Sequence, residues 1–496
     1  MEKHRHSHRG CLSCFSRELD RGGRRRPTDG REDGRMGKEK GEGRKPEFWE
    51  ALLALAVSFA IVVIGIRLRA GMSAPLVAGA FVAGLFGKYL GYTWRELQEG
   101  MFDGIRGSLP AVVILMLVGM MVGVWILGGA VPTMVYYGLK LLTPGMFLAA
   151  ACLLCCVVST ATGTSFGTIG TVGLALMGIG EGLGIPLHMV AGAIVAGAYF
   201  GDKMSPLSDT TNVAPAMAGA ELFEHIGSMM YTTIPALVLS LTMYGFIGMR
   251  FGAGEVRREA VETILTTLTK TFNIGPLALV PPALVIVMSA KRLPAIPALS
   301  TGVAFSGAWA MLTQGADLTS VVRSMMDGYL SKTGVAGVDR LLTRGGLNAM
   351  MGTVALILAA TAMGGILERT GVLSTVIDAV LRKIRSTGSL ILSVVVSCYL
   401  VALVSGNQML AIILPGRAFK EAFAERGIHP RVLSRTLEDA GTLGAPLIPW
   451  STAGLYVYGM LKVSAAAYAP YAFLNWIVPI FALVYGYTGF AIWRKR

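Results

Sequence analysis

Apolar segments long enough to cross a lipid bilayer follow one another through almost the whole chain. A helix needs about 20 apolar residues to cross the hydrocarbon core, because each residue advances it by about 1.5 Å. Such segments fall at 48–66, 72–91, 108–129, 187–217, 229–250, 275–290, 293–312, 347–367, 432–460 and 472–493, and two more, 145–180 and 388–424, are interrupted midway by small polar residues. With 53% hydrophobic and 15% charged residues, the chain could not cover a soluble globule, so an all-α polytopic membrane protein is predicted.

The basic residues indicate how these segments are oriented. The formal net charge is +14, and Lys and Arg are concentrated in the first 45 residues and in the connecting loops. Cytoplasmic loops of membrane proteins carry such an excess of Lys and Arg. The pattern therefore predicts a lipid bilayer as the surroundings, no nucleic-acid partner, and both termini in the cytoplasm.

The first 47 residues differ in composition from the rest. Residues 1–47 are rich in Arg and Gly and hold no apolar run, which predicts a disordered basic tail without a secretory signal. Met36 opens a short polar lead into the first apolar segment, and we hypothesise that translation starts there; N-terminal sequencing would test this. Cys11 and Cys14 form a lone C-x-x-C pair, and without a second ligand pair it predicts no transition-metal site.

The two halves of the membrane region resemble each other. Short motifs recur in the same order: Met101–Gly104 as Met325–Gly328, Thr162–Ser165 as Ser405–Gln408, Gly201–Leu207 as Gly441–Leu447, and Ile234–Phe246 as Val478–Phe490. This order predicts a tandem duplication, with repeat 1 at 48–250, a linker at 251–274 and repeat 2 at 275–496. If the interrupted segment of each repeat re-enters the membrane, each repeat has about five full crossings and the second repeat is inverted, with broken helices near the midplane. If 145–180 crosses twice instead, the repeats are parallel.

Residues 201–212 place polar groups where hydrocarbon is expected. The stretch reads Gly-Asp-Lys-Met-Ser-Pro-Leu-Ser-Asp-Thr-Thr-Asn inside an apolar segment. Pro206 lacks a backbone donor and disfavours the α conformation at Ser205, so the helix must break here. Broken backbone at membrane depth persists only where protein or a water-filled cavity satisfies its polar groups. Its oxygen atoms are ligands that a small hard cation prefers, so the break predicts an ion site; the alternative is a polar loop between two helices.

Inverted repeats would bring this break together with the two interrupted segments. Glycines let the backbone approach an ion, and hydroxyl and amide groups add ligands without adding charge. The predicted Na+ and proton site comprises Asp202, Ser205, Ser208, Asp209, Thr210, Thr211, Asn212, Thr162, Gly163, Thr164, Ser165, Ser405, Gly406, Asn407 and Gln408. Asp209 is expected to be the main ligand and proton carrier, because a buried carboxylate can hold either a proton or a cation. Asp202 either shares this role or forms an ion pair with the adjacent Lys203.

The second break supplies secondary candidates. Glu438, Asp439 and Thr442 lie in it, and Lys203 joins them as a charged group of the first break. For Glu438 and Asp439 the sequence favours a helix entrance over a role in the site.

A few charged residues lie outside these clusters. Glu181, Glu221, Glu224 and His225 are expected in solvated loops, because charged and polar side chains are mostly exposed. Lys462 lies near the end of a span and is expected to extend toward the membrane interface.

The chain holds none of the short motifs of common enzyme classes. H-E-x-x-H, G-x-S-x-G and the Walker loop are absent, so neither an enzyme nor an ATP-driven pump is predicted, and no cofactor is expected beyond the transported ions. A passive channel would need a polar stripe along several helices, and segments such as 108–129 and 347–367 show none. These absences favour a secondary transporter.

The stretch Gly197–Pro215, which reads GAYFGDKMSPLSDTTNVAP, resembles the signature of the NhaC family of bacterial Na+/H+ antiporters. His225–Pro235 is similar to that family's next span, and the likeness runs from about Pro46 to the C-terminus. The resemblance implies inverted repeats, opposed hairpins and elevator-like motion, in the inner membrane of a bacterium.

The same resemblance implies a function. It implies exchange of cytoplasmic Na+, or Li+, for external protons, which serves pH homeostasis. Similar proteins that exchange malate for lactate or carry amino acids make organic-acid or amino-acid antiport the alternative. A carboxylate substrate would need a cation, for which Arg417 and Lys420 are candidates. The sequence leaves both a monomer and a homodimer open.

Overall fold

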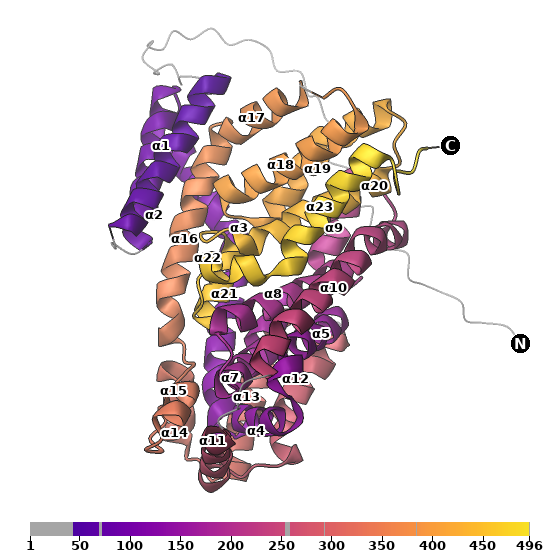
Figure 1. The fold of residues 1–496 in the computed structure, drawn as a ribbon. Helices are drawn as coiled ribbons and strands as arrows, with labels where there is room; N and C mark the ends of the chain where they lie inside the picture. The colour runs from indigo at the N-terminus through magenta and orange to yellow at the C-terminus, as the bar shows by residue number, and fades with distance from the viewer. Residues whose placement is uncertain (1–42, 69–71, 253–257, 292, 383, 496) are drawn as a thin grey trace, which may run out of the picture. The chain divides into compact units, whose positions relative to one another are not determined.

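The computed structural model describes residues 43–68, 72–252, 258–291, 293–382 and 384–495 of the chain (Figure 1). These residues form helices and no strand, apart from two isolated β-bridges. The α-helices are α1 (Phe48–Arg67), α2 (Ser73–Tyr89), α3 (Trp94–Leu127), α4 (Ala130–Leu141), α5 (Pro144–Thr162), α6 (Ser165–Thr168), α7 (Leu174–Gly182), α8 (Leu187–Met204), α9 (Asp209–Ala218), α10 (Leu222–Gly252), α11 (Arg258–Thr271), α12 (Val280–Ala290), α13 (Ala295–Gln314), α14 (Leu318–Asp327), α15 (Ala336–Leu342), α16 (Asn348–Arg369), α17 (Val372–Leu381), α18 (Thr387–Ser405), α19 (Gln408–Glu425), α20 (Pro430–Leu437), α21 (Thr452–Leu461), α22 (Ala465–Tyr468) and α23 (Phe473–Thr488). Short π-helices, η1 (Ile169–Gly173) and η3 (Glu438–Thr442), and 3-10 helices, η2 (Pro276–Leu279), η4 (Ala445–Leu447) and η5 (Ala469–Tyr471), lie between them.

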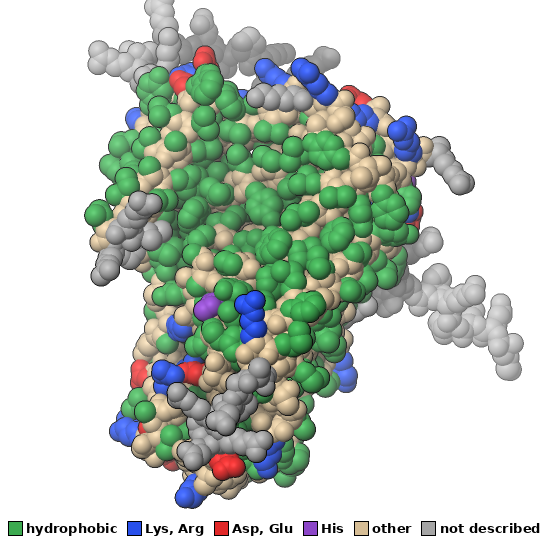
Figure 2. Space-filling model, in the orientation of Figure 1, with side chains coloured by type: hydrophobic (Ala, Val, Ile, Leu, Met, Phe, Trp, Pro, Cys, Tyr) green, Lys and Arg blue, Asp and Glu red, His purple; other side chains and the backbone are tan. Residues whose placement is uncertain are grey.

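Seven helices of the described residues are long and apolar enough to cross a membrane, and two bent helix pairs would raise this number to nine. Figure 2 shows hydrophobic side chains over most of one face, with charged side chains gathered toward its upper and lower ends. Large apolar residues on several helices are exposed; the exposed fractions of Leu53 in α1, Phe81 in α2 and Val157 in α5 are 61%, 62% and 66%. Lipid covers such surfaces at little cost, whereas water does not. The predicted all-α polytopic membrane fold is confirmed.

One group of helices is built on the long helices α3 and α16, which pack along each other through glycines. A Cβ at Gly104 would meet the Thr361 carbonyl oxygen and lie 2.9 Å from the Gly365 Cα. Because lipid tails are as apolar as side chains, close approach of backbones provides the attraction between membrane helices. α2 packs on α16, and α13 and α14 pack on α3, where the Trp125 Nε1 donates a hydrogen bond to the Ser306 Oγ at 2.9 Å.

A second group joins helices from both halves of the chain. α8 packs along α5, α10 packs on α5 and α23, and α18 packs on α19 and α23; Figure 1 shows these segments from distant parts of the sequence side by side. A Cβ at Gly197 in α8 would lie 2.7 Å from the Cys155 Cβ in α5, so only a residue without a side chain permits this spacing. α9 lies against α19 and α20. Both breaks and both interrupted segments therefore belong to one bundle.

The helix interruptions occur where the sequence predicts them. α8 ends at Met204 and the next helix begins at Asp209, on either side of Pro206. α5 and α18 each end before a glycine in the left-handed conformation, Gly163 (φ 70°) and Gly406 (φ 63°), which a residue without a Cβ adopts at no steric cost. The inversion of the repeats, the re-entry of the interrupted segments and the repeat boundaries stay predictions.

The segment predicted as a linker, 251–274, contains the helix α11, which packs against α4, α7 and α15. Leu268 and Phe272 are buried there, so part of the predicted linker is packed against other helices. Of the predicted tail, residues 1–42, including Met36, Cys11 and Cys14, lie outside the described residues. Arg44 forms an ion pair with Glu50 at 2.5 Å (Nη2 to Oε1), and its N–H donates to the Leu90 carbonyl at 3.0 Å.

Candidate ion site

The break between α8 and α9 forms one wall of a cavity. Ser205 has an extended backbone (φ −79°, ψ 127°), as expected for a residue before proline, and it ends α8. The chain resumes as a helix at Asp209, so the C-terminal end of α8 and the N-terminal end of α9 meet at this wall. The side-chain amide of Asn212 donates to the carbonyls of Pro206 (3.0 Å) and Ser208 (2.7 Å); the Ser208 carbonyl also accepts the Asn212 backbone N–H at 3.2 Å.

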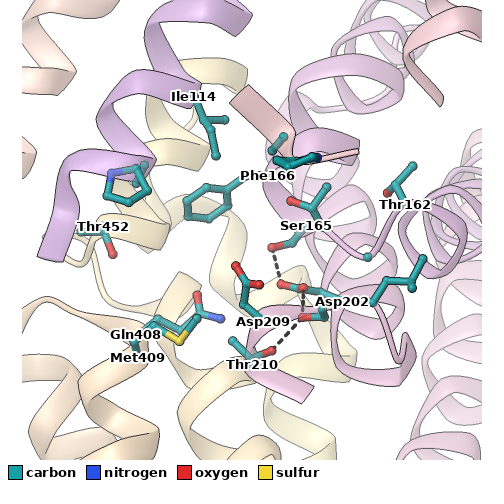
Figure 3. A pocket seen from close by; sticks show the side chains of 18 of the residues that line it. Ile114, Thr162, Ser165, Phe166, Asp202, Asp209, Thr210, Gln408, Met409 and Thr452 are labelled. Atoms are coloured by element: carbon teal, nitrogen blue, oxygen red, sulfur yellow. Dashed lines mark hydrogen bonds between the residues drawn. The ribbon is translucent and has the colours of Figure 1, made fainter. Parts of the chain in front are cut away.

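Asp202 is held at this break by two hydroxyl groups. Its side chain is 6% exposed, and it accepts hydrogen bonds from the Ser165 Oγ at 2.6 Å and the Ser208 Oγ at 2.6 Å (Figure 3). The Thr210 hydroxyl lies 3.1 Å from the Ser208 hydroxyl and continues this network. A carboxylate has about four acceptor positions, so these hydroxyl groups leave room on Asp202 for a cation or a proton.

The first interrupted segment approaches the break closely. A Cβ at Gly163 would lie 2.6 Å from the Leu207 Cβ, so only glycine allows this contact. The Thr164 hydroxyl caps the following helix by accepting from the Gly167 N–H at 3.3 Å. The tip of this segment therefore carries Ser165 to its contact with Asp202.

The second interrupted segment approaches the same cavity from the other half of the chain. The Asn407 side chain caps α19 by accepting from the N–H groups of Met409 (2.9 Å) and Leu410 (3.3 Å). The N–H of Thr452 donates to the Gly406 carbonyl at 2.7 Å, so this tip contacts the start of α21 after the second break. The relation between tip and break is thus repeated in both halves.

The cavity that these segments enclose has a volume of about 660 Å³. Of the residues predicted from the sequence, it is lined by Thr162, Gly163, Thr164, Ser165, Asp202, Ser208, Asp209, Thr210, Asn407 and Gln408. The other predicted residues, which do not line it, are Ser205, Thr211, Asn212, Ser405, Gly406, Lys203, Glu438, Asp439 and Thr442. Thr211 instead donates to the carbonyls of Asp202 (3.0 Å) and Lys203 (2.9 Å) and stabilises the end of α8.

Part of the cavity wall was not anticipated. α3 contributes Ser108 and Pro110, the last turn of α12 contributes Ser289, and the connection between α12 and α13 contributes Pro294. The apolar segment 108–129 begins with a serine and a proline, the same combination that marks the break at 201–212. This combination could have indicated from the sequence that α3 lines the cavity.

The charges that face the cavity are acidic. Asp202 and Asp209 both line it and repel each other electrostatically, and Figure 3 shows the Asp209 side chain pointing into it. No Lys, Arg or His is among the described residues of its wall. Asp209 lies in the first turn of α9, where the helix dipole favours a negative charge. A cation or a proton between the two carboxylates would relieve their repulsion.

A second charged cluster, made of Lys203, Asp439 and Arg435, excludes one of the two roles that the sequence left open for Asp202. The Lys203 Nζ contacts the Asp439 Oδ1, and both side chains are fully buried, so Lys203 does not pair with Asp202. Asp439 also accepts from the Thr232 Oγ1 at 3.0 Å, and its Oδ2 lies 3.9 Å from the Arg435 Nε. Sequence proximity suggested the wrong partner, because consecutive residues of a helix point in different directions.

Glu438 and Asp439 do not form a helix entrance, which the sequence favoured. They lie in the π-helix η3, which continues directly from α20, and both are fully buried. Neither carboxylate oxygen of Glu438 accepts a hydrogen bond within the described part of the chain, and Glu438 interacts electrostatically with Lys203. Glu438 is therefore a buried acidic group rather than a solvated one.

Two other residues that were expected in solvated loops, His225 and Glu181, lie in helices and have partners within the protein. His225 is fully buried in α10, and its Nδ1 lies 2.9 Å from the Ser434 Oγ. Glu181 forms ion pairs with the Arg340 Nε at 2.7 Å and the Arg344 Nη2 at 3.1 Å. Both residues have partners from distant parts of the sequence, which local pattern did not reveal.

Comparison with known proteins identifies the family. A profile described as the Na+/H+ antiporter family matches residues 197–490. The chain is 38% identical over 447 residues to the Na(+)/H(+) antiporter NhaC of Alkalihalophilus pseudofirmus strain OF4, covering 90% of this chain and 96% of that protein. It is 38% identical over 454 residues to the malate-2H(+)/Na(+)-lactate antiporter of Bacillus subtilis strain 168, covering 91% and 97%. It is 35% identical over 457 residues to the arginine/ornithine antiporter ArcD of Halobacterium salinarum, covering 91% and 94%. The chain therefore belongs to the Na+/H+ antiporter family.

Proposed function

We propose that this protein is a secondary antiporter that exchanges cytoplasmic Na+, or Li+, for external protons across a bacterial inner membrane, with both termini in the cytoplasm. The observation that carries the proposal is the cavity itself, which presents two carboxylates and no basic side chain among its described residues. Such a wall attracts a cation and repels a free carboxylate. The NhaC antiporter among the similar proteins supports the same assignment.

Coupling follows from competition for the same oxygen atoms. Na+ would be bound by Asp202 and Asp209, with the hydroxyls of Ser165, Ser208 and Thr210 as neutral oxygen ligands within reach. A proton on either carboxylate removes the charge that binds Na+, so one site holds one or the other. When the cavity is open to one side at a time, this competition makes Na+ release on one side depend on proton uptake there.

A specific observation supports organic-acid or amino-acid antiport as the second candidate. The cavity, about 660 Å³, is far larger than a bare Na+ needs. Asn407 and Gln408 line it at the N-terminal end of α19, where amide groups and the helix dipole could hold a carboxylate. Arg417 and Lys420, the candidate cations for such a substrate, do not line it, which favours the first proposal.

Everted membrane vesicles that contain the protein test these proposals. The vesicles are acidified by respiration, and the recovery of a pH-sensitive dye is followed after Na+, Li+, malate, lactate or an amino acid is added. Recovery with Na+ alone supports Na+/H+ exchange, recovery only with an organic acid supports the second candidate, and no recovery with any of them contradicts both.

Substitutions locate the exchange in the cavity. Asp202→Asn and Asp209→Asn should each abolish Na+-dependent proton flux, while the protein still inserts into the membrane. Asp103→Asn is the matched control, because Asp103 is exposed on α3 and pairs with Arg106 at 3.0 Å outside the cavity. Undiminished flux in both cavity variants would refute the assignment of these carboxylates.

A further inference from the structure

The structure contains a second large cavity, which lies apart from the first and has the opposite charge. Its volume is about 560 Å³, and Arg323, Arg344 and Lys462 line it together with a single acidic residue, Asp327. Leu174, Met350 and Met460 give it an apolar wall, and the Tyr329 side chain adds a ring with a hydroxyl group. No residue of the described wall is shared with the first cavity.

The basic residues come from separate elements that fold toward one space. Arg323 lies on α14, Arg344 lies between α15 and α16, and Lys462 follows the last residue of α21. Asp327 is already engaged, because its Oδ1 accepts a hydrogen bond from the Asn348 side chain at 2.8 Å. In the described part of the chain, no carboxylate forms an ion pair with Arg323 or Lys462.

Arg344 is only partly neutralised. Its Nη2 pairs with Glu181 at 3.1 Å, but the same carboxylate also pairs with Arg340 at 2.7 Å. One negative charge is thus shared by two guanidinium groups. Burial and the neighbouring Arg344 both lower the pKa of Lys462, so the cavity holds positive charges that destabilise one another.

The backbone of Lys462 gives an independent indication. It has a left-handed conformation (φ 57°, ψ 28°), and it is one of two residues other than glycine with a positive φ among those described. Its N–H caps α21 by donating to the Tyr458 carbonyl at 2.9 Å, a position where glycine is the least strained residue. The fold therefore tolerates local strain at the residue that carries an ammonium group to the cavity.

We propose that this second cavity binds an anionic phosphate group at a site that is separate from the cation cavity. The three basic residues would contribute charge-assisted hydrogen bonds, with the planar guanidinium groups of Arg323 and Arg344 suited to a forked oxyanion. The apolar wall accommodates the hydrocarbon part of the ligand. The ligand can be the headgroup of an anionic lipid or a free small anion, since both present the same group.

Binding is measured by titration calorimetry on the purified full chain in neutral detergent. The probes are inorganic phosphate, a short-chain phosphatidylglycerol and, as the zwitterionic comparison, a short-chain phosphatidylcholine. Saturable binding of phosphate, or its competition with the lipid, assigns a free anion; binding of phosphatidylglycerol alone assigns a headgroup site. No saturable binding of either anionic probe overturns the proposal.

Variants distinguish this cavity from general surface charge. Arg323→Gln and Lys462→Gly should each weaken binding about tenfold, the loss of one charge-assisted hydrogen bond. Lys462→Gly also relieves the left-handed backbone, so its effect cannot be attributed to misfolding. Arg95→Gln is the control: Arg95 is exposed on α3, pairs with Glu99 at 3.3 Å and does not line the cavity, so this variant should bind like the unmodified protein. Equal binding by all of these variants would place the anion elsewhere and refute the proposal.

Discussion

Replacing Lys203 by Met should strongly destabilise the fold, because it breaks an ion pair that no solvent reaches. The side chains of Lys203 and Asp439 are both 0% exposed. Without the ammonium group, Asp439 keeps one hydrogen bond, from Thr232 at 3.0 Å, and a distant guanidinium, whose Nε lies 3.9 Å from its Oδ2. Removing one partner of a buried pair leaves an uncompensated charge and costs about 3–5 kcal/mol. Met has a similar shape, so little of this loss comes from a cavity.

Replacing Asp439 together with Lys203 should restore part of the lost stability. The double variant Lys203→Met, Asp439→Leu leaves no carboxylate at position 439 without its ammonium partner. Its loss of stability should therefore be smaller than the sum of the two single losses by about 2 kcal/mol or more. Arg435 keeps other support, because its Nη1 donates to the Ala491 carbonyl at 3.0 Å and its guanidinium lies 5.6 Å from the Trp493 ring centre.

The free energy of unfolding is measured in detergent by tryptophan fluorescence during titration with a denaturing detergent. Lys88→Met is the control, because Lys88 is exposed in the last turn of α2 and such a substitution usually changes stability by less than about 0.5 kcal/mol. If Lys203→Met unfolds like Lys88→Met, or if the losses of the two single variants simply add, the pair does not hold α8 to η3 and the reasoning is wrong.

Three further outcomes are expected from single substitutions. Ser165→Ala and Ser208→Ala each remove one hydroxyl group that donates a hydrogen bond to the Asp202 carboxylate. Each variant should raise the half-saturating Na+ concentration in vesicles by about tenfold, the loss of one hydrogen bond to a charged group. An unchanged concentration would show that these hydroxyl groups take no part in ion binding. Gly197→Ala would press a methyl group against the Cys152 carbonyl and the Cys155 side chain and should cost about 1–3 kcal/mol in detergent unfolding, whereas Gly227→Ala, with no atom within 4 Å, should not destabilise. Hydrogen bonds from the Thr333 N–H and then from the hydroxyls of Ser331 and Thr333 lower the pKa of Asp339. The Asp339 carboxylate therefore stabilises the fold at neutral pH, and this contribution is lost as the pH falls through the lowered pKa. Limited proteolysis of the connection between α14 and α16 should rise in acid, and Asp339→Asn should remove this pH dependence.

The sequence by itself determined the features that depend on neighbouring residues. Runs of apolar residues specified membrane helices, because in lipid each backbone group must be bonded within its own helix. Pro206 specified the end of α8, and Gly163 and Gly406 specified the turns after α5 and α18, because these residues restrict or release their own backbone. The polar residues gathered at these interruptions gave most of the cavity wall.

Only the tertiary structure decided which polar groups became partners. Lys203 pairs with a residue 236 positions away rather than with its neighbour, and His225 is buried against a helix from the other half of the chain. α3 and the start of α13 complete the first cavity, and Lys462 contributes to a second one. Sequence pattern specifies the face of a helix, but the partner of a buried charge depends on how separate helices pack, and that packing follows from close contacts at residues such as Gly104 and Gly197.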